Sequence, residues 1–277
     1  MKIAVWSPVP FSGRKTSQLL LFAWETIAED GGEQLVIHAD YKGSGPEHYL
    51  LSGKDRNRMM ERKEFGIEYL TRVLHCERFT KEAVINASYT FAGGKLHVLP
   101  AGDEFFYRGR ESATAMEVAG IMQSADDVFQ NVWVELPAGD TELSRKLLSM
   151  VDCVIVNLAQ SPCELQRVES LPQMQPAFYV VGAYEPRCIY TLHNLMLLIP
   201  KFRGRCAGVP YHAGYHAACC EGKAEYFFVR ETGKGEEGEK TYFRKEVEKA
   251  YVKWKEWVKT EHVGKKREEE KTGKTGI

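Results

Sequence analysis

A lysine followed by two hydroxyl residues stands where the first predicted helix begins. Lys15-Thr16-Ser17 follows a short apolar run, Lys2–Trp6, and a turn that contains Pro and Gly. In a strand–loop–helix unit of this kind, backbone N–H groups at the helix N-terminus face an anion. The Lys reaches the terminal phosphates, and the hydroxyl binds Mg²⁺. The predicted phosphate-binding residues are Ser12, Gly13, Arg14, Lys15, Thr16 and Ser17.

Acidic side chains occur where two further predicted strands end. Asp40 follows the apolar run Gln34–His38, and Glu135 closes the run Asn131–Glu135. The carboxyl ends of parallel strands lie at one edge of a sheet, where ligands bind. Because carboxylates and hydroxyls are ligands for Mg²⁺, Thr16, Asp40 and Glu135 are the predicted metal ligands. Lys15 and Asp40 are the predicted catalytic groups.

Each of these residues also has a purely structural interpretation. Lys15 and Thr16 could form an ordinary solvated helix start. Asp40 could cap the turn over residues 43–45. A buried carboxylate at Glu135 needs a cationic partner, and either a metal ion or the ammonium group of Lys15 would serve.

The elements that must position these residues alternate along the chain. Short apolar runs with turn signals at their ends are separated by stretches of helical periodicity, which predicts an α/β fold. The expected architecture is a three-layer, doubly wound, mostly parallel sheet with helices on both faces. The predicted strands are Lys2–Trp6, Gln34–His38, Lys95–Leu99, Asn131–Glu135, Cys153–Leu158, Ala177–Gly182 and Ala207–Pro210. The predicted helices are Lys15–Ala28, Gly66–Leu74, Ser112–Ser124, Thr141–Met150, Cys163–Ser170 and Thr191–Leu198.

Composition narrows the class of protein. The chain has 277 residues, of which 44% are hydrophobic and 27% charged, as in ordinary globular proteins. A net charge of −1 gives no overall attraction to nucleic acid or to a membrane. The odd number of cysteines, 7, without a C-x-x-C motif, favours reduced thiols. With no apolar run long enough for a membrane span, we expect a cytoplasmic protein.

The C-terminal part of the sequence differs from the rest. We expect an α/β domain over 1–231, a Gly- and charge-rich linker over 232–239, an amphipathic helix over 240–262 and a disordered charged tail over 263–277. The helix could pack on the domain, or it could lie on an anionic membrane surface as a peripheral contact. Its apolar stripe comprises Phe243, Val247, Ala250, Tyr251, Trp254, Trp257 and Val258.

The order of these segments resembles the MinD/ParA family of P-loop ATPases, and in particular its TadZ/CpaE-type members, which accompany Tad pili. The resemblance is carried by AVWSPVPFSGRKTSQLL, LVIHADYKGSG, KLHVLPAGDEF, VWVELPAGDTELSRKLLSMVDCVIVNLAQSP and FYVVGAYEPRCIYTLHNL. It implies ATP or ADP with Mg²⁺ as ligands, with Pro186 among the nucleotide-binding residues. It also implies a homodimer, and partners in a pilus, secretion or positioning apparatus.

Several positions depart from the pattern of that family. The loop pattern G-x-x-x-x-G-K-[ST] expects Gly where the chain has Val9 and Arg14, and a register with Arg14 as the loop cation stays open. The other departures are Pro10 for a second lysine, His38 for the first Asp of a D-x-D motif, Glu135 for an Asp and Ala183 for an Asn. Together they suggest a degenerate phosphate-binding loop.

Three functions therefore remain as hypotheses. The first is a nucleotide-binding switch with slow or absent hydrolysis. The second is a scaffold of the same fold that works without nucleotide. The third, a DNA-partitioning ATPase, has the least support because no basic face interleaved with aromatic residues is visible outside the tail.

Overall fold

The structure, a computed structural model, describes residues 1–10, 14–60, 65–76, 79–101, 109–170, 176–232 and 240–272. For residues 57–60, 166, 169, 170, 232 and 262–272 it describes the backbone only.

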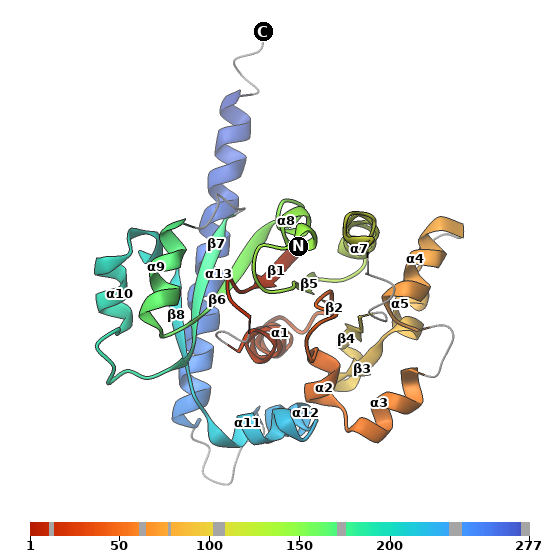
Figure 1. The fold of residues 1–277 in the computed structure, drawn as a ribbon, viewed down its shortest axis with the longest axis horizontal. Helices are drawn as coiled ribbons and strands as arrows, with labels where there is room; N and C mark the ends of the chain where they lie inside the picture. Colours follow the sequence, from red (N-terminus) through yellow and green to blue (C-terminus); the bar gives the residue numbers. More distant parts are fainter. Residues whose placement is uncertain are drawn as a thin grey trace.

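A single mixed β-sheet forms the centre of the fold (Figure 1). Its strands lie in the order β3-β4-β2-β5-β1-β6-β7-β8 and are all parallel except for the β3–β4 pair. The predicted doubly wound α/β fold is confirmed. The strands are β1 (Lys2–Trp6), β2 (Gln34–His38), β3 (Tyr89–Phe91), β4 (Leu96–Leu99), β5 (Asn131–Glu135), β6 (Cys153–Ala159), β7 (Ala177–Tyr184) and β8 (Cys206–Pro210).

Helices cover both faces of the sheet. Successive residues of each strand point to opposite sides, so apolar side chains on both faces are buried under helices. Ala4 of β1 belongs to one buried cluster and Ile3 to the other. The first face carries α4 (Gly66–Cys76), α5 (Lys81–Ala87), α7 (Glu111–Asp126), α8 (Glu142–Leu148), α9 (Pro162–Ser170) and α10 (Leu192–Leu198). The second carries α1 (Lys15–Asp30), α2 (Pro46–Leu50), α11 (Ala213–Cys220), α12 (Ala224–Thr232) and α13 (Tyr242–Thr272).

Strand β1 lies between β5 and β6, and this position determines where the first helix begins. Ile3 pairs with Trp133 of β5 and with Cys153 of β6. The helix that follows β1, α1, is buried from Lys15 to Thr26. It is capped at its C-terminus by Gly31, whose φ of 72° suits a residue without a side chain. The start of α1 is therefore held beside the carboxyl ends of β5 and β2.

Helix α13 packs on the second face of the sheet. All seven residues of its predicted apolar stripe are buried, from Phe243 to Val258. Trp254 lies against Phe22 of α1, with ring centroids 5.8 Å apart, and against Trp133 of β5, at 5.5 Å. Of the two alternatives for this helix, the structure shows packing on the domain, so the stripe is not available for a membrane surface. None of the helices in the described ranges is long and apolar enough to cross a bilayer.

Some boundaries and short elements differ from the predicted ones. Helix α13 continues past residue 262 to Thr272, into the segment predicted as disordered, because its Lys, Arg and Glu residues favour helix. Residues 233–239 of the predicted linker and 273–277 of the predicted tail lie outside the described residues. Strand β3, α2, α5, α12 and α3 (Gly53–Met60) were not predicted, since each is too short to show a clear period.

Replacing Trp254 by Ala should lower the free energy of unfolding by about 3–5 kcal/mol, because it leaves a cavity among buried aromatic rings. Urea unfolding followed by circular dichroism would measure this loss. Val252→Ala is the matched control, since Val252 lies on the same helix but is 37% exposed. Equal stability of the two variants would contradict the packing of α13 on the sheet.

Candidate functional site

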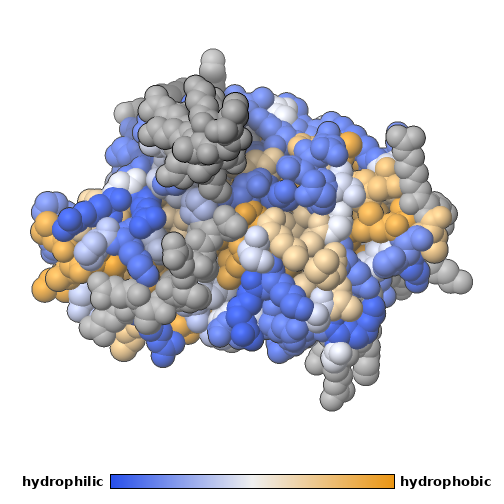
Figure 2. Space-filling view, turned by 90° about the horizontal axis from the view of Figure 1, so that it is seen from above, coloured by the Kyte–Doolittle hydropathy of each residue, from blue (hydrophilic) through white to orange (hydrophobic). Residues whose placement is uncertain are grey.

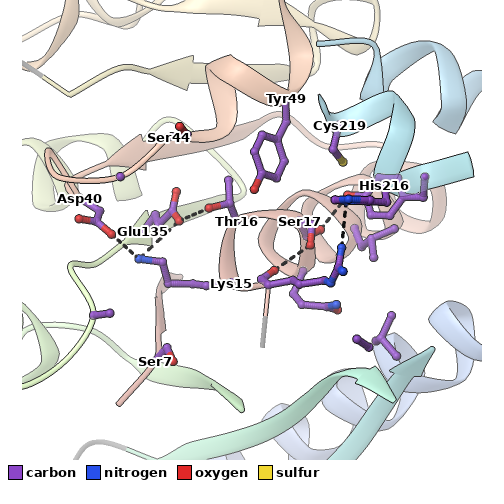
Figure 3. Close-up of a pocket in the computed structure, with 18 of the residues that line it drawn as sticks. Ser7, Lys15, Thr16, Ser17, Asp40, Ser44, Tyr49, Glu135, His216 and Cys219 are labelled. Atoms are coloured by element: carbon purple, nitrogen blue, oxygen red, sulfur yellow. Dashed lines mark hydrogen bonds and ion pairs between the residues drawn. The ribbon is translucent and has the colours of Figure 1, made fainter. Parts of the chain in front are cut away.

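The structure brings the ammonium group of Lys15 together with two acidic side chains, one that follows β2 and one at the end of β5 (Figure 3). Lys15 Nζ donates to Asp40 Oδ2 at 2.8 Å and lies 3.5 Å from Glu135 Oε1. It also donates to the backbone carbonyl of Leu136. Lys15 is only 9% exposed, so these charged groups interact with little screening by water.

Glu135 has one carboxylate oxygen in use and one without a partner. Thr16 Oγ1 donates to Glu135 Oε1 at 2.5 Å. Glu135 Oε2 is buried and has no hydrogen-bond partner among the described residues. An unpartnered buried carboxylate oxygen is costly. This oxygen beside the hydroxyl of Thr16 is a donor set that suits a divalent cation.

Backbone pairing fixes the positions of these groups. The N–H of Leu136 donates to the carbonyl of Val5 at 3.0 Å, and the N–H of Ala39 donates to the carbonyl of Glu135 at 3.0 Å. His38 lies opposite Glu135 in the sheet register. The strand ends of β1, β2 and β5 are therefore level, which is why residues so distant in sequence meet here.

A buried ion pair between His38 and Glu47 positions the loop that carries Asp40. His38 Nδ1 lies 3.0 Å from Glu47 Oε1 of α2, and His38 Nε2 lies 2.7 Å from the carbonyl of Asp40. A β-carbon at Gly45 would come within 2.1 Å of the His38 ring, so the loop requires Gly at this position. His38, which replaces an expected Asp, thus holds the loop that carries Asp40.

The pKa values of this pair move in opposite directions. Burial by itself would lower the pKa of His38, but the charge of Glu47 and the hydrogen bond to it outweigh burial and raise the pKa to about 9. Burial would raise the pKa of Glu47, but the charge of His38 and the hydrogen bonds from His38 and His48 hold it well below its usual value. The pair is therefore charged at neutral pH.

These groups form part of the wall of a large cavity with a volume of about 740 Å³. The cavity is bounded by the loop before α1, by the segments that follow β2 and β5, and by β8 and α11. Lys15, Asp40 and Glu135 lie at one end. Leu21 of α1 and Tyr215 of α11 also contribute to the wall. The cavity is therefore lined by charged, aromatic and apolar side chains, with the acidic groups at one end.

Arg14 points away from the acidic groups. Its backbone is left-handed, with φ 55° and ψ 47°, a conformation that glycine adopts without strain. Its guanidinium carbon lies 4.8 Å from the ring centroid of Tyr211, and its Nη1 lies 3.0 Å from His216 Nδ1. Lys15, and not Arg14, therefore supplies the cation in the acidic cluster. These contacts favour the register with Lys15 as the loop cation.

The other predicted site residues are divided between the cavity and the surface. Thr16 and Ser17 line the cavity, whereas Ser12 and Gly13 lie outside the described residues. Pro186 is exposed in the turn after β7 and does not line the cavity. Ala183 does line it, with a left-handed φ of 51°. That conformation is one that Asn tolerates better than Ala.

Most residues that line the cavity were not predicted from the sequence, and Tyr49, Tyr211 and His216 are among them. Tyr211 directly follows β8, so the rule that ligands bind beyond the carboxyl ends of strands could have identified it. Tyr49 lies on the short helix α2, and burial raises its pKa to about 12. Neither Tyr49 nor His216 stands in a recognisable motif, and only the packing of α2 and α11 brings them to the cavity.

A metal ion at this site would need further ligands in addition to the side chains of this chain. No group of three or more His, Cys, Asp and Glu residues in the described ranges could hold one. Mg²⁺ commonly takes one or two carboxylates and completes its shell with water and substrate phosphates. The set of Thr16, Glu135 and Asp40 fits that mode of binding.

The chain is similar in structure to bacterial and archaeal ATPases. The ParA family ATPase of Chlorobium tepidum TLS matches with a TM-score of 0.69 and 12% identity, covering 91% of this chain and 97% of that chain. The cell division ATPase MinD of Pyrococcus furiosus matches with a TM-score of 0.64 and 12% identity, covering 92% and 98%. MinD of Pyrococcus horikoshii OT3, complexed with Mg-ADP, matches with a TM-score of 0.62 and 12% identity, covering 93% and 95%.

These matches show the fold: the chain has the three-layer α/β fold of the MinD and ParA ATPases. No protein-family model matches the sequence, and no curated protein matches it.

Raising the pH from 6.5 to 9 should lower the free energy of unfolding through His38. Its pKa is about 9 in the folded state and about 6.5 unfolded, so the folded protein holds the extra proton in this interval. The stabilisation is complete below pH 6.5 and disappears as the pH rises to 9. The expected loss is on the order of 1–3 kcal/mol, measured by urea unfolding at each pH.

Glu47→Gln should flatten or reverse this pH dependence, because it removes the charge that keeps His38 protonated. Glu248→Gln is the control, since Glu248 forms an ion pair with Lys240 on the surface. An unchanged pH dependence in Glu47→Gln would show that the pair does not hold the proton.

Proposed function

We propose that this chain binds ATP with Mg²⁺ and acts as a nucleotide-dependent localisation or assembly switch with slow or absent hydrolysis. One observation carries the proposal. The ammonium group of Lys15, at the N-terminus of α1, opens onto the charged end of a cavity with a volume of about 740 Å³. The N-terminus of a helix favours anions, and the cavity is large enough for a nucleotide.

The acidic groups around Lys15 are consistent with a bound Mg–phosphate unit. Phosphate oxygens would offer Lys15 the same charge-assisted hydrogen bonds that Asp40 offers now. Thr16 and Glu135, whose Oε2 accepts no hydrogen bond from the described residues, would hold Mg²⁺ together with Asp40. A Mg²⁺ ion there would neutralise phosphate charge.

The residues available for catalysis are consistent with slow hydrolysis. Asp40 forms an ion pair with Lys15 and accepts a hydrogen bond from it, so its carboxylate is already engaged by a side chain of the site and is not free to activate a water molecule. Pro10, at the place of the second lysine in the resembling family, has no side chain that could donate to a phosphate. With hydrolysis this slow, the binding and release of the nucleotide, and not its hydrolysis, would control the contacts of the chain with its partners.

A more specific cellular role is supported only by the resemblance of the sequence to TadZ/CpaE-type proteins. In that role the chain is a cytoplasmic homodimer that positions components of a pilus or secretion apparatus. Because the stripe of α13 is buried, any peripheral membrane contact would involve another surface. Nucleic acid is not a proposed partner, because the net charge is −1.

A second candidate function, a scaffold that works without nucleotide, is favoured by the same cluster. Lys15 already has acceptors from its own chain in Asp40 and Leu136. An internal cation that neutralises two carboxylates can stabilise the fold without any ligand.

Calorimetric titration with ATP and Mg²⁺ separates the two functions. We expect saturable binding by the wild type, and Lys15→Gln should weaken it by about 10- to 100-fold, because a hydrogen bond to a charged group is lost. The glutamine keeps a donor for the carbonyl of Leu136. Lys255→Gln is the matched control, since Lys255 also contacts two carboxylates, Glu29 and Asp30, but lies outside the cavity.

Thermal unfolding of both lysine variants would show that they remain folded. If the chain is a nucleotide-dependent switch, the wild type should bind ATP. Glu135→Gln should then make the affinity for ATP less dependent on Mg²⁺. A wild type that gives no binding heat at millimolar ATP would contradict the proposal and favour the scaffold.

A further inference from the structure

Arg14 and Tyr211 form a stacked pair at the rim of the cavity. The guanidinium carbon lies 4.8 Å from the ring centroid of Tyr211. Both residues line the cavity, and Tyr211 is 50% exposed. A half-exposed aromatic ring that lines a cavity is a surface on which a planar ligand can lie.

The guanidinium group of Arg14 has two side-chain partners among the described residues, and neither of them is an acid. They are the ring of Tyr211 and Nδ1 of His216, to which Nη1 is close enough to donate at 3.0 Å. The hydrogen bond to His216 fixes the orientation of the guanidinium plane. Arginine planes stack well on aromatic rings and on nucleic acid bases.

The strand order places this pair opposite the predicted metal ligands. Asp40 and Glu135 follow β2 and end β5, which lie on one side of β1. Tyr211 follows β8, which lies on the other side. Figure 3 shows the same separation, with Asp40 and Glu135 at one end of the cavity and His216 at the other. A nucleotide with its phosphates at Lys15 and its metal at the acidic end would extend its base toward Tyr211.

The conformation of Arg14 gives a further reason to assign a role to its side chain. The backbone is left-handed, where an arginine is strained and a glycine is not. Strain of this kind commonly occurs at ligand-binding sites. An arginine at this position is explained if its side chain contacts a ligand.

We infer that Arg14 and Tyr211 form a stacking platform for the purine base of the bound nucleotide. His216 is a positioning residue that orients the guanidinium group of Arg14. This inference rests on the proposed nucleotide binding and adds to it the residues that distinguish a nucleotide from a bare polyphosphate.

The test compares two ligands, ATP and inorganic tripolyphosphate, each with Mg²⁺, by calorimetry on the full chain. The wild type should bind ATP more tightly than tripolyphosphate. Tyr211→Leu and Arg14→Asn should each reduce this preference by about 5- to 100-fold, the range expected for loss of base stacking, while leaving tripolyphosphate binding within about twofold. Asn is chosen at position 14 because it tolerates the left-handed backbone.

Matched controls separate stacking from general effects of the substitutions. Tyr226→Leu removes a tyrosine that is 68% exposed on α12, and Arg187→Asn removes an exposed arginine in the turn after β7; neither residue lines the cavity. Both should keep the wild-type preference. His216→Ala should reduce the preference less than Arg14→Asn does.

The outcomes distinguish this inference from the proposed function. If the wild type binds both ligands but Tyr211→Leu and Arg14→Asn keep its preference for ATP, the platform is overturned and nucleotide binding stands. If Arg14→Asn weakens both ligands equally, Arg14 contacts phosphates and the platform is also overturned. If the wild type binds neither ligand, the proposed function fails and the platform with it.

Discussion

The placement of the Lys15 ammonium group between two carboxylates and a carbonyl is the interaction on which the site depends. Lys15 and Glu135 are both almost fully buried, and either charge would be costly there without the other. The cluster therefore requires that β1, β2 and β5 end at the same level and that α1 begins directly beside them. The central position of β1 in the sheet meets this requirement.

Two layers of support keep this cluster in place. On one side, the buried pair of His38 and Glu47 ties α2 to the loop of Asp40. On the other, α1 is covered by α13, whose aromatic residues pack against Phe22 and Trp133. Helix α13 thus belongs to the domain that holds the site, and its apolar stripe serves as core.

Several residues at the site differ from those that the phosphate-loop pattern expects, and two of them have a left-handed backbone. Arg14 keeps a left-handed backbone although it is not glycine, and Ala183 does so although it is not asparagine. Glu135 stands where that pattern expects Asp, and it accepts a hydrogen bond from the hydroxyl of Thr16. Strand pairing and helix packing fix the backbone at these positions, and the side chains must fit the conformation that results.

The sequence by itself determined most of the architecture. Apolar runs and turn signals predicted seven of the strands, because a central strand buried on both faces must be continuously apolar. It also determined that Lys15, Asp40 and Glu135 follow or end strands at one edge of the sheet. Only the tertiary structure decided that Arg14 turns toward Tyr211 and His216, that His38 pairs with Glu47, and that α13 covers the sheet. These outcomes depend on contacts between residues far apart in the chain, and no local periodicity or spacing carries that information.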